Sequence, residues 1–485
     1  MSVFSDLLNV YIRDKEIKIS SLVKFCGTDR STMYKIINGK RNPPSMELFH
    51  KIAVFLHLTP AEFQKLEEAW KITITGPEIY YRRKNVESFI CTFPAPSAAA
   101  IPDYPLLQPE YDRNSSGEAA LTSRQQINNC LHRMLLTEAG RISGHIGLLL
   151  QPDHEFLFSL LSSLKPSGTL DIRHILCISG KDCFTGSHEL YNLKCLKKIF
   201  PLYMAGLAYS PKYFYDSIEA HYYNFNMLPC LILTSDSALM CSSDYQTGIF
   251  YDNQEIVRML WKQYNSYYDK CGPLFQPVPM LPENSAEFFD ILLNTTDRDN
   301  VALIQPEACL TPFITETILN EVFNHSLPGG EKILKAASQN FANNLRKLRL
   351  GQFLLYFTTE GLTHFARTGL MEEIPEVFYT PFSPSQRIQI LQGVLSACQE
   401  GSYRILKKPL NHLPENLRLC VRDETCSLTF KDNTGRIILL NILESSFLDA
   451  FHDYLLHVDP TCFCSPQEAS EFVSRTITAL RMENR

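Results

Sequence analysis

The chain has 485 residues, of which 45% are hydrophobic and 20% are charged, and its formal net charge at pH 7 is −6. This length exceeds that of one ordinary domain, so we expect two or three separate cores. No uninterrupted apolar run approaches about 18 residues, and the N-terminus carries no basic segment. The sequence therefore predicts neither a membrane span nor a signal peptide.

Cysteine and charge distributions indicate a compartment and a class of partner. The fifteen cysteines follow no small-domain framework, which fits free thiols in a reducing compartment, so we expect a cytoplasmic protein. Residues 1–90 contain 14 Lys+Arg against 10 Asp+Glu, so the rest of the chain carries the whole acidic surplus. Only the N-terminal segment suits a polyanionic partner.

The first predicted helix is amphipathic. Its apolar residues recur at the spacing i, i+3, i+4, i+7 and i+8, which is the stripe of a helix with one buried face. They are Phe4, Leu7, Leu8, Tyr11 and Ile12.

Residues 19–42 are laid out as a short helix, a glycine turn and a second helix, which is the order of a helix-turn-helix. Gly27 stands at the break, where a positive φ is least costly for glycine. Asp29 is placed to cap the second helix by accepting from its unpaired amides. Leu22 and Val23 face inward from the first helix, and the buried face of the second is expected at Met33 and Ile36.

The outward positions of the second helix and of the loop behind it form a cationic, hydrogen-bonding edge suited to DNA phosphates and base edges. They are Arg30, Ser31, Tyr34, Lys35, Asn38, Gly39, Lys40 and Arg41.

Two further helices complete the predicted N-terminal domain. Pro43 and Pro44 stop the chain, and Ser45 can cap a fourth helix. The sequence Thr59–Glu62 has the form of a capping box with proline at the first helical position and opens a fifth helix. Five short helices within residues 1–75 predict a compact all-α domain.

Residues 4–70 resemble the lambda-repressor-like XRE family of helix-turn-helix proteins. The resemblance rests on Gly27-Thr28, the stretch Arg30–Lys35, the closing Asn38–Lys40, and the run from Leu48 to Thr59. It implies that this domain binds double-stranded DNA, with the recognition helix in the major groove.

The resemblance also implies a role for each exposed residue. Arg30, Ser31 and Lys35 would face bases, and Tyr34 could contact either bases or phosphates. The backbone would be held by Thr32, Asn38, Lys40 and Arg41. The sequence departs from the family at Ile19, where a polar phosphate contact is common, and at Ile37, which predicts an additional apolar contact beneath the loop.

Residues 76–118 are expected to be a linker, extended at its start, because the stretch from Thr92 to Gly117 is dense in proline, alanine, serine and asparagine. A large mixed α/β region follows, which we divide into lobes at residues 119–275 and 276–485. Its alternating pattern predicts helices at 121–140, 156–164, 189–200, 254–269, 286–294, 311–324, 331–348, 384–400, 446–457 and 466–482. It predicts strands at 146–150, 172–179, 228–233, 238–241, 248–251, 301–305 and 353–358, with short strands through 403–441.

Residues 231–268 and 417–456 share one pattern, namely strand, short strand, glycine turn, strand and an aromatic-rich helix. Two explanations remain open at this point. Either the region is duplicated, or units of sheet and helix resemble one another by default.

Catalytic motifs are missing from the large region. The sequence has no G-x-x-x-x-G-K-[ST], G-x-G-x-x-G, H-E-x-x-H or G-x-S-x-G, and it lacks the H-x-K-x-x-x-x-D of phospholipase-D-like hydrolases. The nearest candidate for a phosphate cradle is Ser179–Ser187, between a strand and a helix, but its spacing matches no standard phosphate-binding loop, which favours an ordinary strand-to-helix turn.

Taken together, the sequence predicts a DNA-binding transcriptional regulator that is not an enzyme and has no cofactor, no metal site and no membrane partner. We expect a homodimer, because one helix-turn-helix reads only a few base pairs. The large region would then dimerise or respond to a small-molecule or protein effector. The alternatives are an enzyme, or an interaction scaffold, that carries a DNA-targeting helix-turn-helix.

Overall fold

The computed structural model describes residues 2–43, 45–93, 118–180, 184, 188–224, 226–279, 300–372, 374–414, 417–423 and 425–483. The chain divides into two compact units. The first comprises Met1–Asn85 with Phe184–Leu190, and the second comprises Val86–Cys183 with Tyr191–Arg485. The predicted helix at 286–294 and most of the predicted cradle at 179–187 lie outside the described residues.

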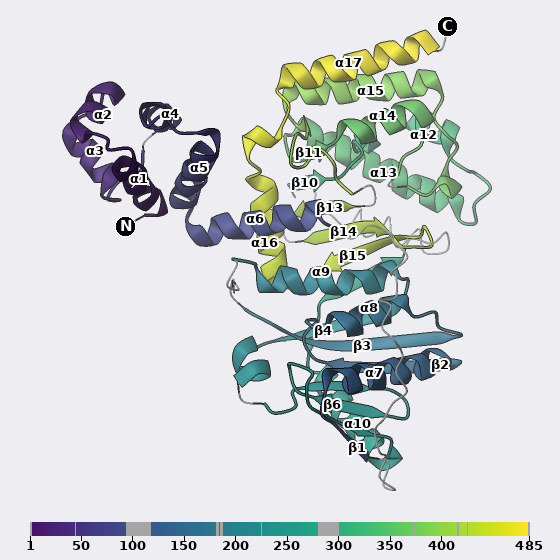
Figure 1. The fold of residues 1–485 in the computed structure, drawn as a ribbon. Helices are drawn as coiled ribbons and strands as arrows, with labels where there is room; N and C mark the ends of the chain where they lie inside the picture. The colour runs from purple at the N-terminus through teal and green to yellow at the C-terminus, as the bar shows by residue number, and fades with distance from the viewer. Residues whose placement is uncertain are drawn as a thin grey trace. The chain divides into compact units, whose positions relative to one another are not determined.

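The first unit contains the predicted helical domain, coloured purple in Figure 1. Its helices are α1 (Val3–Asp14), α2 (Ile19–Cys26), α3 (Arg30–Ile37), α4 (Met46–Phe55) and α5 (Pro60–Thr75). Both predicted caps are confirmed: Ser45 accepts from the amide of Leu48, and Thr59 and Glu62 form a reciprocal capping box. The apolar stripe of α1 supplies the fully buried Phe4 and Leu8 to one core.

Part of the predicted linker is a helix, so the expectation of an extended piece after α5 was wrong. Gly76, at φ 89°, ends α5, and Pro77 opens α6 (Pro77–Cys91), a position where proline is well tolerated. The division between the two units falls within α6. Val86, Phe89 and Ile90 are fully buried in the second unit, where the ring of Phe89 lies 5.8 Å from that of Phe200. Residues 94–117 of the predicted linker lie outside the described part.

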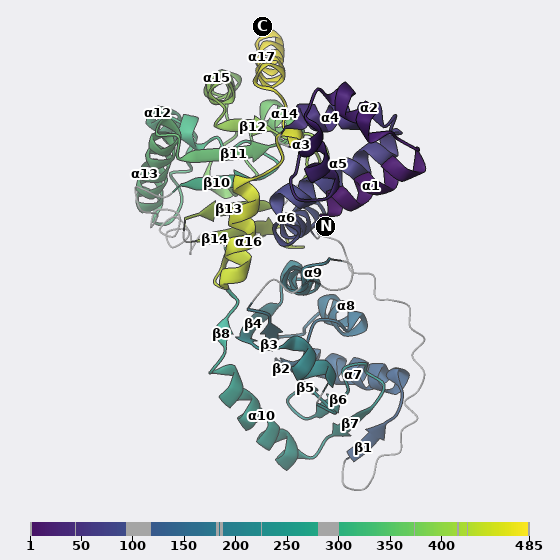
Figure 2. The same cartoon turned by 90° about the vertical axis from the view of Figure 1, so that its left-hand side faces the viewer.

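The second unit contains two mixed sheets, and its α/β class is as predicted. The described strands of the first sheet lie in the order β1-β7-β6-β5-β2-β3-β4-β8. They are β1 (Glu118–Leu121), β2 (Ser143–Leu149), β3 (Thr169–Ile178), β4 (Ala208–Tyr215), β5 (Cys230–Leu233), β6 (Ala238–Cys241), β7 (Gly248–Tyr251) and β8 (Gly272–Pro273). Its helices are α7 (Arg124–Ala139), α8 (Glu155–Ser163), α9 (Tyr191–Met204), the π-helix η1 (Glu219–Asn224) and α10 (Gln254–Tyr268). Figure 2 shows α7 and α8 on one side of this sheet and α10 on the other.

The second sheet has the order β12-β11-β10-β13-β14-β15-β9 among the described strands. These are β9 (Phe275–Pro279), β10 (Val301–Ile304), β11 (Phe353–Phe357), β12 (Tyr403–Ile405), β13 (Arg418–Arg422), β14 (Cys426–Lys431) and β15 (Ile437–Ile442). Its α-helices are α12 (Glu316–Val322), α13 (Gly330–Arg349), α14 (Thr359–Thr368), α15 (Pro384–Glu400), α16 (Ser445–Leu456) and α17 (Pro466–Glu483). Three short 3₁₀ segments are η3 (Thr311–Phe313), η4 (Glu376–Phe378) and η5 (Pro460–Cys462).

Seven strands of the first sheet match the seven strands of the second in order and direction, which favours duplication over chance likeness; β8, beside β4, has no counterpart among the described strands. In each, two neighbouring strand pairs are parallel, β2-β3-β4 in the first sheet and β10-β11-β12 in the second. On the other side of β2 the strands β5, β6, β7 and β1 pair antiparallel in that order, as β13, β14, β15 and β9 do beside β10. Helix α10 follows β7, and helix α16 follows β15.

Alternation along the strands places helices on both faces of the second sheet. Phe353, Leu355 and Phe357 of β11 pack in the core formed with α13, α14, α15 and α17. Tyr356 points to the opposite face, because successive side chains alternate. Its hydroxyl donates to the carbonyl of Leu455 in α16 at 2.9 Å.

Several details differ from the predicted elements. The predicted helix at 311–324 is a 3₁₀ turn, η3, followed by the shorter α12. Strands β1, β4 and β9 and helix α14 were not predicted. No helix among the described residues is long and apolar enough to cross a bilayer. The boundaries of the four predicted domains stay predictions.

Candidate nucleic-acid interface

The turn between α2 and α3 depends on a left-handed residue. Gly27 has φ 64° and ψ 31°, as the sequence predicts for the break between the two helices. A Cβ at this position would meet no other atom within 4 Å. Glycine is therefore favoured here by its backbone conformation and not by lack of space.

The recognition helix α3 begins at a side-chain cap. The carboxylate of Asp29 accepts from the backbone N–H of Thr32 at 2.8 Å, which confirms the predicted cap. Hydrogen bonds from Thr32 hold the pKa of the Asp29 carboxyl below its usual value. Because the Asp29 carboxylate accepts from the first turn of α3, its negative charge is held at the N-terminus of that helix.

The inner face of α3 is anchored in the core of the helical domain. Met33 and Ile36 are fully buried, as predicted, and Ile37 is 4% exposed. The apolar contact that the sequence predicts beneath the loop at Ile37 is therefore present. This anchoring fixes the rotation of α3 about its axis and so decides which residues face outward.

The loop after α3 is held by the last turn of the helix. The carbonyl of Lys35 accepts from the amides of Lys40 and Arg41, at 2.8 and 3.1 Å. Gly39 permits this reversal with a φ of 69°. The backbone positions of both cations are thus fixed relative to α3, while both residues are exposed.

The predicted contact residues share one property, which is accessibility. Six of them are exposed and two are partly exposed: Arg30, Ser31, Lys35, Asn38, Lys40 and Arg41 in the first group, Thr32 and Tyr34 in the second. The guanidinium of Arg30 lies over the ring of Tyr34, 5.5 Å from its centroid, which restrains both side chains. The assignment of each residue to bases or to phosphates stays a prediction.

One positioning residue escaped the sequence analysis. The side-chain amide of Asn9, on α1, donates to the carbonyl of Ile37 at 2.8 Å and to that of Ser5 at 2.8 Å. It therefore ties the C-terminal end of α3 to α1. The apolar pattern of α1 gives no signal for this contact, because Asn9 lies beside the stripe and not in it.

The geometry defines a helix-turn-helix with a cationic outer edge. The residues from Arg30 to Arg41 contain four cations and no acid. Their hydroxyl, amide and guanidinium groups are the kinds that bind phosphate oxygens and base edges.

The comparison with protein families agrees with this class. Residues 8–69 match the family model of the Cro/C1-type HTH DNA-binding domain. The N-terminal domain is thus a helix-turn-helix domain of Cro/C1 type, which confirms the resemblance found from the sequence.

Two solved structures that match the chain resemble it only weakly. No curated protein matches the chain. One solved structure, of the archaeal chromatin protein TrmBL2, is 14% identical over 44% of this chain and 71% of that chain, with a TM-score of 0.22. Another, of the polyphosphate kinase from Porphyromonas gingivalis, is 10% identical over 74% of this chain and 56% of that chain, with a TM-score of 0.20. At these scores neither carries a conclusion about this chain.

Proposed function

We propose that this protein is a sequence-specific DNA-binding transcriptional regulator of the cytoplasm that acts as a homodimer. The helix-turn-helix reads double-stranded DNA, and the two-sheet region dimerises and receives a signal from a small-molecule or protein effector. The region needs no catalytic activity for this role.

The single observation that carries the proposal is the placement of α3. Its inner face is locked by Met33 and Ile36, while Arg30, Ser31 and Lys35 remain exposed on the outside. A helix held in this way can enter the major groove without rearrangement of the domain.

The need for a dimer follows from the size of this surface. One α3 can reach the edges of only a few base pairs, and regulators of this kind gain specificity from two half-sites about one helical turn apart. The large second unit supplies the additional surface that a dimer would use.

The test is a selection of bound DNA from random sequence with the full chain, followed by affinity measurements on the selected site. We expect a pseudo-palindromic site. Arg30→Ala combined with Lys35→Ala should cost about 1–3 kcal/mol for each base-edge interaction that the variant no longer makes, and it should flatten the sequence preference. Lys40→Ala should weaken binding to all sequences alike and lower the salt slope by about one unit.

Lys65→Ala is the matched control, because Lys65 is an exposed lysine on α5, outside the helix-turn-helix. It should leave both sequence preference and salt slope unchanged. An unchanged preference in the double variant would overturn the assignment of the base-facing side. A monomer by light scattering, both free and on the selected DNA, would overturn the dimer. Turnover of a substrate by the second unit would favour the alternative of a DNA-targeted enzyme.

A further inference from the structure

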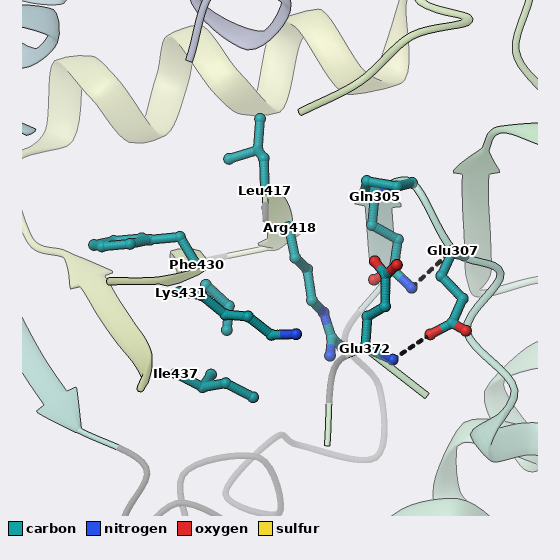
Figure 3. A pocket seen from close by; sticks show the side chains of 10 residues that line it. Gln305, Glu307, Glu372, Leu417, Arg418, Phe430, Lys431 and Ile437 are labelled. Atoms are coloured by element: carbon teal, nitrogen blue, oxygen red, sulfur yellow. Dashed lines mark hydrogen bonds between the residues drawn. The ribbon is translucent and has the colours of Figure 1, made fainter. Parts of the chain in front are cut away.

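A cavity opens in the second sheet at the carboxyl end of β10. Its polar lining comes from Gln305, Glu307, Glu372, Arg418 and Lys431 (Figure 3). The cavity is partly open to solvent and has a volume of about 40 Å³. One water needs roughly 10–15 Å³, so the cavity admits a head group of a few heavy atoms.

The sheet topology brings these residues together. Strand β10 is parallel to β11 but antiparallel to β13, so strand direction changes at this point, where open α/β sheets often bind ligands. Ile304 pairs with Leu419, which places Gln305 beside Arg418 just beyond the end of β10. Arg418 in turn pairs with Thr429, and Lys431 lies on the same face of β14, two residues further on.

Gln305 is buried, and the oxygen of its side-chain amide has no hydrogen-bond partner among the described residues. Its side chain is 3% exposed, and its Nε2 donates to the carbonyl of Glu307 at 2.8 Å. Its Oε1 accepts from no atom of the described structure. A buried carbonyl without a donor is costly, and a ligand that donates to it would remove that cost.

The charged part of the lining consists of two cations and two acids. Arg418 and Lys431 project from β13 and β14, whereas Glu307 and Glu372 follow β10 and α14. Figure 3 shows Gln305, Glu307 and Glu372 together across the cavity from Lys431, with Arg418 between them. Glu307 is held in place because its Oε2 accepts from the backbone N–H of Glu372 at 2.8 Å.

We propose that this cavity binds a small zwitterion of the amino-acid class. Its carboxylate lies against Arg418 and Lys431, the cations best suited to bind a carboxylate. Its ammonium group donates to Oε1 of Gln305 and faces Glu307 and Glu372.

The first sheet contains a partial copy of the same site. Gln151-Pro152-Asp153 follows β2 as Gln305-Pro306-Glu307 follows β10, the equivalent strand. Gln151 is also 3% exposed, and neither atom of its amide has a partner among the described residues. The first sheet differs from the second at the positions equivalent to Arg418 and Lys431.

The strand registers identify what replaces them. Leu149 pairs with Leu231, and Cys230 pairs with Cys241. When the two Gln-Pro-acid segments are aligned, these registers place Pro229 at the position of Arg418 and Asp244 at that of Lys431. The first sheet therefore lacks the carboxylate-binding side, and we assign the ligand to the second sheet alone.

The assignment of a ligand does not depend on DNA binding. Its use as the effector does rest on the proposed function, so the two are measured separately. A ligand that binds without changing DNA affinity would support the site and overturn only its effector role.

The experiment is a calorimetric titration of the full chain with each common amino acid, and with acetate, methylamine and inorganic phosphate as probes that carry only one sign of charge. We expect at least one amino acid to bind and these three probes to bind far more weakly. Lys431→Met and Gln305→Leu should each weaken binding about tenfold or more. Gln151→Leu is the matched control and should leave affinity unchanged.

Lys431 is partly exposed, so its variant tests the site even if Gln305→Leu fails to fold. Three results would overturn the proposal. These are no heat with any amino acid at millimolar concentration, equal binding of acetate or phosphate, and binding that survives Lys431→Met.

Discussion

Gly27→Ala isolates the energetic cost of the helix-turn-helix turn. The residue has φ 64°, and a Cβ there would meet nothing within 4 Å, so the substitution introduces no steric overlap with neighbours. What remains is the cost of a left-handed conformation for an L-residue, about 1–2 kcal/mol. With a urea slope of about 1–3 kcal/mol/M for a small domain, the midpoint should fall by roughly 1 M. Gly27→Asn should cost less, because asparagine tolerates this region.

Trp70 provides the assay. It packs against the core of the helical domain, with its ring centroid 5.6 Å from that of Phe49. In a Trp261→Phe background it is the only tryptophan of the chain, so fluorescence in urea follows this domain. Gly140→Ala is the control, since Gly140 has φ −74° and lies in the second unit. Equal losses for Gly27→Ala and Gly27→Asn, or no loss for either, would refute the reasoning.

Two further predictions concern the two cores. Met33→Ala removes a fully buried side chain on the inner face of α3 and should lower the stability of the helical domain by about 2–5 kcal/mol. The same fluorescence measures this loss. A loss below about 1 kcal/mol would mean that Met33 does not anchor α3. In the second unit, burial, together with the charge of Arg124, lowers the pKa of His154 to about 4. The unfolded chain therefore binds a proton that the folded chain does not, so stability should fall as the pH drops from about 6.5 to about 4, by up to about 3 kcal/mol. The urea midpoint should fall less between these pH values in His154→Gln than in the unsubstituted chain. An equal fall in both would contradict the assignment of the pH dependence to His154.

The helical domain was predictable because its signals are local. The cap at Asp29, the left-handed Gly27 and the buried Met33 each follow from a residue and its near neighbours. Helix α6 was missed although Val86, Phe89, Ile90 and Phe93 have helical spacing, because the polar stretch before them and the proline-rich stretch after them suggested a linker. The missed strand β4 is rich in tyrosine and contains Pro211, which weakened its pattern.

The cavity in the second sheet could not be predicted from local patterns. Gln305, Arg418 and Lys431 lie on separate segments, and only the pairing of β10 with β13 and of β13 with β14 brings them together. Glu372 joins them from the loop after α14, where its backbone N–H donates to Glu307. The repeated Gln-Pro-acid segment was present in the sequence, but its meaning depends on knowing that β2 and β10 are equivalent. The strand-and-helix likeness of residues 231–268 and 417–456 was the visible part of that duplication.

The shared topology of the two sheets has a consequence for stoichiometry. Because both sheets belong to one polypeptide, they are always made in equal amounts. One sheet can therefore change its binding residues while the other keeps them. The first sheet, in which Gln151 follows β2, keeps the strand order but has Pro229 and Asp244 where the second sheet has two cations. A homodimer would therefore have two recognition helices and four sheets, but a complete cavity in only two of those sheets. Each recognition helix would then be accompanied by one ligand-binding cavity.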